Sequence, residues 1–521
     1  MSETQPVATR REVLAVLPAL MLAMMLAMLD NMIVSTAMPR IVGDLHGLSH
    51  LSWVVTAYVL GTTVSTPLWG KIGDLYGRKS IFLTSVVVFL IGSALSGAAH
   101  TMGQLIGFRA LQGLGAGGLM VGVLAIIGDL VPPRERGKYQ GYFAGIMALA
   151  MVAGPLAGGY ITDHLSWRWA FYVNLPLGAV ALILLATRLK LPKYRTEHRI
   201  DWTGAGLLAV GITALVLITT WGGNEYAWRS AQILGLIALA LVTLVAFVVV
   251  ERRAPEPILS LQLFRNRNFS LTAVVGFLLG FTMFGAINFL PLYQQVVQGA
   301  SATNSGLLLL PMMAGMLVTS LVAGQLITRT GHYKTFPVLG GGFMVTGMVL
   351  LSTLTMTTGK LVTSVFMVVL GMGMGFLMQT TMLISQNSVS QKDLGVASSA
   401  ATFFRSIGGS FGVSLFGAIF NRTLTDDLTS RLGPKVATTV SSGGQLAGLS
   451  PDKLKAIPLP ILNALLHGIA TATSSVFFSA MFIAALVPIA AVFIKQVPLR
   501  GRAPADAASI EPAEPQLVAA E

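Results

Sequence analysis

The sequence contains no cysteine, and few of its residues carry a charge. The lack of cysteine excludes disulfides, thiol chemistry and cysteine-ligated metal sites, and it says nothing about the compartment. Only 11% of the residues are charged, against about a quarter in a typical soluble protein, whereas 54% are hydrophobic. A chain of 521 residues with this balance is predicted to be a polytopic membrane protein.

Motifs of several other function classes are also missing. We find no phosphate-binding glycine loop, no nucleophile with its base and no metal-ligand spacing, which argues against an enzyme, an ATP-driven pump and a bound cofactor. The net charge of +13 resides in short loops between apolar runs. That distribution is typical of membrane topology, so we expect no nucleic-acid partner.

Fourteen apolar runs are each long enough to cross a bilayer as a helix. The first is too long for a cleavable signal peptide and is expected to remain as a helix. Loops on the side of the termini hold 23 of the 34 Lys and Arg residues, and the opposite loops hold 9, which predicts that both termini are cytoplasmic. The runs cover residues 13–37, 51–70, 80–99, 104–130, 138–162, 169–189, 203–221, 231–250, 269–291, 305–327, 336–356, 361–385, 394–420 and 468–494.

One carboxylate lies deep within the first run. Of the 21 acidic residues, Asp30 alone is far from both ends of its run, and all seven histidines lie in or beside loops. A carboxylate at membrane depth costs several kcal/mol, so Asp30 is the leading candidate for a proton-binding site. At about 1.5 Å per residue, Arg109 reaches a comparable depth, where the two charges could pair. Two alternatives stay open: a carboxylate locked to Arg109 for structure alone, and an Arg109 side chain that reaches the outer headgroups.

Two motifs rich in glycine stand out. The first links the second and third runs, and a degraded copy spans residues 324–331, as two homologous bundles would leave behind. The second lies in the fifth run, where its glycines could equally serve close helix packing alone. The first motif comprises Gly70, Gly73, Asp74, Gly77, Arg78 and Lys79, and the second comprises Gly154, Pro155, Gly158 and Gly159.

These motifs resemble those of the major facilitator superfamily, in particular its 14-span drug:proton antiporters. The link at 70–79 resembles the loop signature, residues 109–116 the fourth-helix motif, and residues 154–159 the fifth-helix antiporter motif. Residues 29–39, 167–178 and 395–405 are similar to stretches characteristic of the 14-span members. The resemblance covers about residues 12–495 of the chain.

The resemblance implies an all-α fold of two pseudo-symmetric six-helix bundles and two extra spans. We expect a cytoplasmic tail at 1–12, the first bundle at 13–190, the inserted spans at 191–268 and the second bundle at 269–495. Within the second bundle, residues 421–467 are predicted to form a long external loop, and residues 496–521 a disordered cytoplasmic tail.

The function implied is proton-coupled antiport, in which lipophilic, often cationic drugs or antibiotics leave the cell by alternating access. The expected partners are a small-molecule substrate and the bilayer of the cytoplasmic (inner) membrane, with the proton as coupling ion, no cofactor and a monomeric state. A single deep carboxylate predicts one proton per turnover. Two alternatives are an exporter of an endogenous lipid, siderophore or self-made antibiotic, and a membrane receptor or scaffold that transports nothing.

The expected site residues form three groups beside the antiporter motif. Proton coupling is assigned to Asp30 and Arg109. The cytoplasmic gate is assigned to the 70–79 motif and Asp129. The resemblance implies that Asp74 meets the start of the run near Leu394 and that Arg78 pairs with Asp129. The alternative is that this loop is merely solvated. The expected substrate pocket comprises Asp30, Asn31, Tyr58, Gln112, Met147, Phe281, Phe284, Asn288, Met312, Met313, Met378, Gln379, Phe403 and Arg405.

Arg405 is a second charge inside an apolar run, about 11 residues from its start. Three interpretations are open for it. It could bind an anionic group of a substrate, balance Asp30, or donate to exposed backbone carbonyls.

Overall fold

A computed structural model describes residues 10–45, 51–189, 191, 201–223, 225–300, 308–390, 393–433 and 458–499. Within these ranges the chain is helical, and one isolated bridge between Gly222 and Tyr226 is the only β pairing. The first part contains α1 (Arg10–Leu45), α2 (Leu51–Tyr76), α3 (Arg78–Gly97), α4 (Met102–Leu130), α5 (Pro133–His164), α6 (Trp169–Tyr172), α7 (Asn174–Arg188), α8 (Trp202–Trp221) and α9 (Ala231–Glu251). The second part contains η2 (Leu261–Arg265), α10 (Arg267–Val296), α12 (Leu310–Thr330), α13 (Thr335–Leu351), α14 (Lys360–Asn387), α15 (Leu394–Leu432) and α18 (Leu459–Val492).

Each predicted apolar run overlaps a helix over most of its described length, with the run at 169–189 divided between α6 and α7 and the run at 336–356 leaving α13 after Leu351. In the described part of the chain, eleven helices are long and apolar enough to cross a membrane. Helices α2 and α5 are not among these eleven, and α13 is a shorter apolar helix. The polytopic class is therefore supported, whereas the count of fourteen spans stays a prediction.

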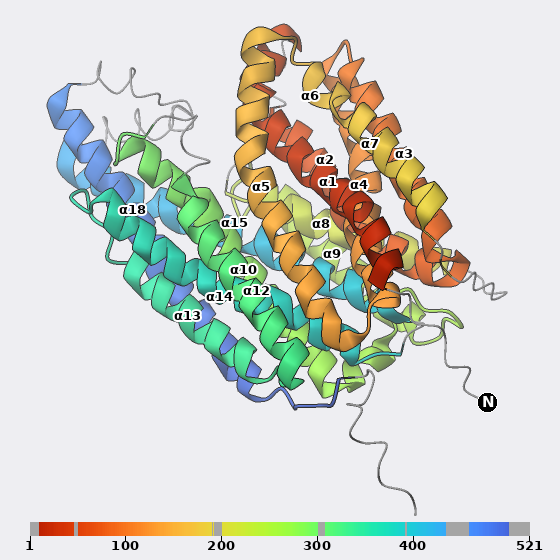
Figure 1. Cartoon of the computed structure of the whole chain (residues 1–521). Coiled ribbons are helices and arrows are strands. Elements are labelled where there is room, and N and C mark those ends of the chain that lie inside the picture. The colour runs from red at the N-terminus through yellow and green to blue at the C-terminus, as the bar shows by residue number, and fades with distance from the viewer. Residues whose placement is uncertain are drawn as a thin grey trace, which may run out of the picture.

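The helices form two bundles that lie side by side (Figure 1). Helices α1 to α7 make the first, and α10, α12 to α15 and α18 make the second. The bundles meet along α2 with α15 and along α5 with α12. The inserted helices α8 and α9 pack against each other, and α8 contacts both α2 and α15. An ion pair at 2.7 Å between Lys71 Nζ and Glu256 Oε2 ties the segment after α9 to α2.

Glycine allows the helices to approach closely where two backbones cross. A Cβ atom at Gly408 of α15 would lie 2.0 Å from the carbonyl oxygen of Phe277 in α10. A Cβ atom at Gly113 of α4 would lie 2.3 Å from the carbonyl oxygen of Tyr58 in α2. Small residues at such crossings are the usual means of helix association in lipid, where no hydrophobic driving force is available.

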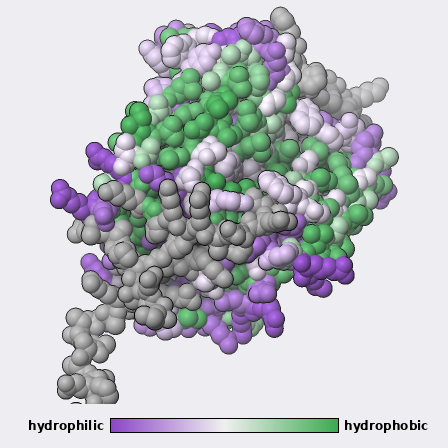
Figure 2. All heavy atoms as spheres, turned by 90° about the vertical axis from the view of Figure 1, so that its right-hand side faces the viewer, coloured by the Kyte–Doolittle hydropathy of each residue, from purple (hydrophilic) through white to green (hydrophobic). Residues whose placement is uncertain are grey.

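The outer surface is apolar in a band across the molecule. The face shown in Figure 2 is hydrophobic over its middle and hydrophilic toward its upper and lower edges. On α9 the aliphatic side chains of Leu241, Val242 and Val245 are all more than 60% exposed. Such surface is costly in water and favourable in lipid, as expected for a helix that faces the bilayer.

The predicted loop at 421–467 requires correction at both ends. Helix α15 continues to Leu432, and α18 already begins at Leu459. Leu424 and Leu428, four residues apart, are buried in the core of the second bundle, which explains why the helix extends beyond its apolar run. The central part of this loop, 434–457, and the tails at 1–9 and 500–521 lie outside the described residues.

Candidate functional site

Asp30 lies in the interior of the first bundle with no exposed surface. Its Oδ2 atom accepts a hydrogen bond from Arg109 Nη1 at 2.5 Å, and this contact is also an ion pair. Its Oδ1 atom accepts from Gln112 Nε2 and from Asn174 Nδ2, both at 2.8 Å. Both carboxylate oxygens are thus occupied by partners from α4 and α7, which compensates the charge for its loss of water.

Arg109 is held on more than one side. Its Cζ atom lies 4.1 Å from the centroid of the Tyr58 ring, and its Nη1 atom also donates to Gln112 Oε1 at 2.8 Å. The hydroxyl of Tyr58 donates to the carbonyl oxygen of Ala27 on α1 at 3.0 Å. The Nε and Nη2 atoms of Arg109 are buried without a partner in the described part of the chain. The guanidinium therefore points inward and does not reach the headgroups, which excludes that alternative in this conformation.

Two polar residues of this cluster were not among the expected site residues. Asn174 is 1% exposed, and its Nδ2 atom donates both to Asp30 and to Ser93 Oγ. Ser93 in turn donates to the carbonyl oxygen of Phe171. The signal that points to Asn174 is a lone amide at the head of an apolar run, inside a stretch that resembles the family.

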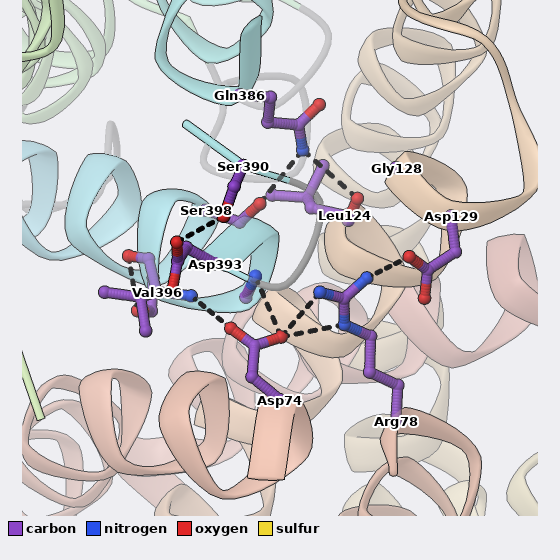
Figure 3. Close-up of polar contacts among 12 residues, drawn as sticks. Asp74, Arg78, Leu124, Gly128, Asp129, Gln386, Ser390, Asp393, Val396 and Ser398 are labelled. Carbon is purple, nitrogen blue, oxygen red and sulfur yellow. Dashed lines mark hydrogen bonds and ion pairs between the residues drawn. The ribbon is translucent and has the colours of Figure 1, made fainter. Parts of the chain in front are cut away.

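A second polar cluster joins the two bundles at the end of α2 (Figure 3). The carboxylate of Asp74 accepts from the backbone N–H groups of Gly395 at 3.1 Å and Val396 at 3.0 Å, at the start of α15. Arg78 donates to Asp74 Oδ1 from Nε at 2.8 Å and from Nη2 at 2.6 Å, and its Nη1 atom pairs with Asp129. We call Asp74, Arg78, Asp129 and the first turn of α15 the latch.

The latch combines charge neutralisation with a helix terminus. Free N–H groups and the positive end of the helix dipole favour a carboxylate at this place. Burial raises the pKa of Asp74 to about 6, while Arg78 and the two N–H groups act in the opposite direction.

Further contacts close the same end of the molecule. Gln386 of α14 donates to the carbonyl oxygen of Leu124 in α4 and to Ser398 Oγ in α15. A Cβ atom at Gly70 would lie 2.7 Å from the carbonyl oxygen of Gly395, so α2 and α15 touch at their backbones. Of the other members of the loop motif, Gly73 accepts from the backbone N–H of Gly77 at 3.1 Å, and Lys79 Nζ donates to the carbonyl oxygen of Ala186 in α7 at 2.7 Å.

The degraded copy of the loop motif, at residues 324–331, keeps the glycine turn and lacks the equivalent of the Asp74 carboxylate. Gly77 and Gly331, which are equivalent in the repeat, both have positive φ, 97° and 71°, a conformation that favours glycine. Thr328 takes the place of Asp74, and its hydroxyl donates to Gly324 within its own helix at 2.7 Å. The acid of the latch thus belongs to the first bundle alone.

The glycines of the fifth-run motif differ in their surroundings. A Cβ atom at Gly154 would lie 2.4 Å from Met32 Cβ, and one at Gly158 would lie 2.0 Å from Thr36 Oγ1, both on α1. A Cβ atom at Gly159 would meet nothing within 4 Å. Pro155 lies within α5. The motif therefore seats α5 against the helix that carries Asp30.

The structure places the expected substrate-pocket residues in several different surroundings. Four expected pocket residues are core residues in this conformation, because they lie on helix faces that pack against neighbouring helices: Phe281, Met312, Met313 and Phe403. Phe403 belongs to the cluster between α15 and α8. Tyr58 and Gln112 belong to the Asp30 cluster, and Gln379 is buried with Ser320 Oγ 3.3 Å from its Oε1.

The remaining expected pocket residues keep some accessible surface. Asn288 is exposed, and Asn31 and Arg405 are partly buried. The other three, Met147, Phe284 and Met378, are partly buried against the core of the second bundle. Met147 projects from α5 of the first bundle, so this group spans the border between the two bundles.

The sequence is similar to known membrane transporters over most of its length. The sequence model of the Major Facilitator Superfamily matches residues 20–413. The multidrug transporter protein MdtP of Bacillus subtilis (strain 168) is 41% identical over 507 residues, which cover 93% of each chain. The acurin A biosynthesis cluster MFS-type transporter of Aspergillus aculeatus is 33% identical over 435 residues, covering 82% of this chain and 78% of the relative.

The solved structures show the same fold at low sequence identity. The crystal structure of the human organic anion transporter MFSD10 superposes with a TM-score of 0.60 at 14% identity. The match covers 91% of this chain and all of the solved one. At this identity the likeness concerns the arrangement of helices alone.

Proposed function

Because the chain belongs to the major facilitator superfamily, and is therefore a transporter rather than an enzyme, we propose that it is a proton-coupled drug antiporter. It would export lipophilic small molecules across the cytoplasmic membrane by alternating access, with both termini in the cytoplasm. The pattern of fourteen apolar runs supports placing it among the 14-span antiporters. Relatives named as a multidrug transporter and as a multidrug resistance protein support the drug substrate.

The observation that carries the proton coupling is the buried Asp30–Arg109 pair. A proton on Asp30 would remove its negative charge and weaken the ion pair, which leaves Arg109 buried and uncompensated. Both oxygens are bonded and inaccessible here, so a proton would reach Asp30 only when the cluster opens. Protonation of Asp30 is therefore tied to a conformational change. Exchange of proton for substrate then requires only that the two ligands stabilise different conformations of the transporter.

The latch supports a conformation closed on the cytoplasmic side. It ties the end of α2 to the start of α15, and Gln386 with Leu124 adds a second contact across the bundles. If both termini are cytoplasmic, these contacts close the inner end of the molecule, as alternating access requires of every state that is not open to the cytoplasm. Inward opening would then require the latch to break.

Asp74→Asn is expected to shift the protein toward the inward-open state. A carboxylate at a partly buried helix N-terminus contributes up to about 2 kcal/mol, which corresponds to a roughly thirtyfold change in the ratio of the two states. Since the chain has no cysteine, spin labels on Ser80→Cys and Lys334→Cys can report the distance between the bundles at this end. Electron–electron resonance should show a longer, broader distribution in Asp74→Asn.

The matched control for the latch is Asp426→Asn, which removes an exposed aspartate that pairs, within the described ranges, only with Arg422 at 3.8 Å. It should leave the distance distribution unchanged. An Asp74→Asn protein with the wild-type distribution would show that the latch does not hold the closed state.

The proposed function is tested with purified protein in liposomes. A proton gradient, acidic on the side that corresponds to the cell exterior, should drive a lipophilic substrate toward that side, and the flux should stop when an ionophore dissipates the gradient. Substrate movement that ignores the proton gradient at constant voltage would contradict antiport.

A second candidate is the export of a product made by the host itself. The similarity to a transporter named for a biosynthesis cluster favours this possibility. Expression in a drug-sensitive host separates the two candidates: a multidrug exporter should raise resistance to chemically unrelated compounds, and a dedicated exporter to one class alone.

A further inference from the structure

Arg405 is a guanidinium inside the membrane region that has no partner among the residues that the structure describes. Among the described residues it forms no hydrogen bond and no ion pair, and it is only partly buried. It lies 11 residues after Leu394, the first residue of α15. This spacing places it about 16 Å from the latch, near the middle of a hydrocarbon layer about 30 Å thick.

The structure removes two of the three interpretations of this residue. Asp30 cannot be its counterion, because Arg109, Gln112 and Asn174 occupy both oxygens of that carboxylate. No carbonyl oxygen in the described ranges accepts a hydrogen bond from Arg405. A bare charge at this depth is costly, and intramembrane charges are retained chiefly where a partner or a substrate compensates them.

The face of α15 that carries Arg405 is turned toward the interior. Ser398, Thr402, Arg405 and Gly409 recur at spacings of four, three and four residues, which places them on one side of the helix. Ser398 accepts from Gln386 of α14, and a Cβ atom at Gly409 would lie 2.5 Å from the Phe284 ring of α10. Phe403, on the opposite side, packs in the cluster with α8.

We propose that Arg405 binds the ionised carboxylate of a lipophilic organic acid, which is a transported substrate. The planar guanidinium matches a carboxylate with two parallel N–H donors. The partly buried side chains of Met147, Phe284 and Met378, at the border of the bundles, supply apolar surface for the rest of such a molecule. This inference rests on the proposed function and names the substrate class of the same transporter.

The charge distribution favours an acid over a base. At membrane depth the chain has one carboxylate, Asp30, which is fully buried and paired, whereas Arg405 is unpaired in the part that the structure describes. A cationic substrate would meet a free positive charge and no free negative one. The expectation of a cationic substrate therefore does not follow from the structure.

An acid also changes the charge moved in each cycle. Exchange of one proton inward for one monovalent cation outward moves no net charge. Exchange of one proton inward for one anion outward moves two positive charges inward, so a membrane potential that is negative inside drives the export. Transport of the acid should respond to voltage as well as to the proton gradient.

The test uses three probes with the same apolar body: 1-pyrenebutyrate, the neutral 1-pyrenebutanol and the cationic 4-(1-pyrenyl)butyltrimethylammonium. Fluorescence titration of the purified full-length protein gives a Kd for each. A hydrogen-bonded charge pair predicts that the wild type binds the carboxylate roughly ten- to a hundredfold more tightly than the alcohol. Arg405→Gln should abolish this preference, and Arg405→Lys should retain part of it.

Binding of 1-pyrenebutanol at wild-type strength shows that Arg405→Gln is folded. The control Arg267→Gln, which removes an exposed charge beside Phe493, should keep the full preference for the carboxylate. The proposal is overturned if the wild type binds the three probes equally, prefers the cation, or keeps its preference in Arg405→Gln.

Failure of this proposal differs from failure of the proposed function. Proton-driven export of whichever of the three probes the wild type binds best measures the transporter, and its absence would contradict proton-coupled export whatever the order of the three Kd values. The preference for the acid, measured by equilibrium binding, needs no proton gradient.

Discussion

Asp30→Asn is expected to abolish proton-driven export, because the sequence places no other carboxylate at membrane depth that could bind the exchanged proton. The side chain keeps its size but can no longer bind and release a proton. Initial rates of gradient-driven flux in liposomes measure the loss.

The same variant should still exchange labelled for unlabelled substrate across the membrane. Asparagine resembles the protonated acid, so substrate binding and the rocking of the bundles need not depend on a proton. The control is Asp44→Asn, at the exposed end of the same helix, where the carboxylate accepts from Trp167 Nε1 at 2.8 Å. Full proton-driven export by Asp30→Asn would reduce Asp30 to a structural carboxylate.

Gly158→Val is expected to abolish transport, whereas Gly159→Val, one residue further, should leave it nearly unchanged. At Gly158 even the first side-chain carbon would lie 2.0 Å from Thr36 Oγ1 and 2.9 Å from the carbonyl oxygen of Ile33, so α1 must move. Overpacking of this kind costs about 1–3 kcal/mol or more. Ile33 is three residues from Asp30, and a displaced α1 would pull the carboxylate away from Arg109.

Gly159 provides the matched control, because a Cβ atom there has open space around it. Export rates per folded protein, with folding checked by size-exclusion chromatography and thermal unfolding, measure both variants. Equal behaviour of the two would mean that the motif acts through something other than the contact between α5 and α1.

Charged residues made the centre of the site predictable from the sequence. A carboxylate and a guanidinium are so costly at membrane depth that counting residues along two helices suffices to pair Asp30 with Arg109. The structure contains this pair at 2.5 Å. Asn174 could not be predicted in this way. Burying an amide in an apolar run costs much less free energy than burying a charge, and the depth of Asn174 alone identifies no partner.

The substrate pocket was less predictable, for a geometric reason. Helical spacing identifies residues that share a face, but it does not say which neighbour covers that face. Phe403 and Arg405 are two residues apart on α15, yet Phe403 packs with α8 while Arg405 stays unpaired in the described part of the chain. The ends of helices were uncertain for a related reason: buried contacts of Leu424 and Leu428 extend α15 beyond its apolar run.

The residues alone predict where the latch lies in the sequence, but they do not predict its contacts with α15. The glycine spacing predicts the turn at Gly77, and the repeat predicts a second one at Gly331. The contacts of Asp74 with Gly395 and Val396 join residues more than 300 positions apart, and the resemblance alone pointed to them.

In the proposed mechanism, Asp30 carries the proton that is exchanged for substrate. Simultaneous measurement of proton and substrate fluxes in liposomes, at clamped voltage, tests this claim most directly. We predict one proton inward for each substrate molecule outward in the wild type, and no proton movement linked to substrate in Asp30→Asn. Two or more protons per substrate, or coupled proton movement that persists without the Asp30 carboxylate, would contradict the account.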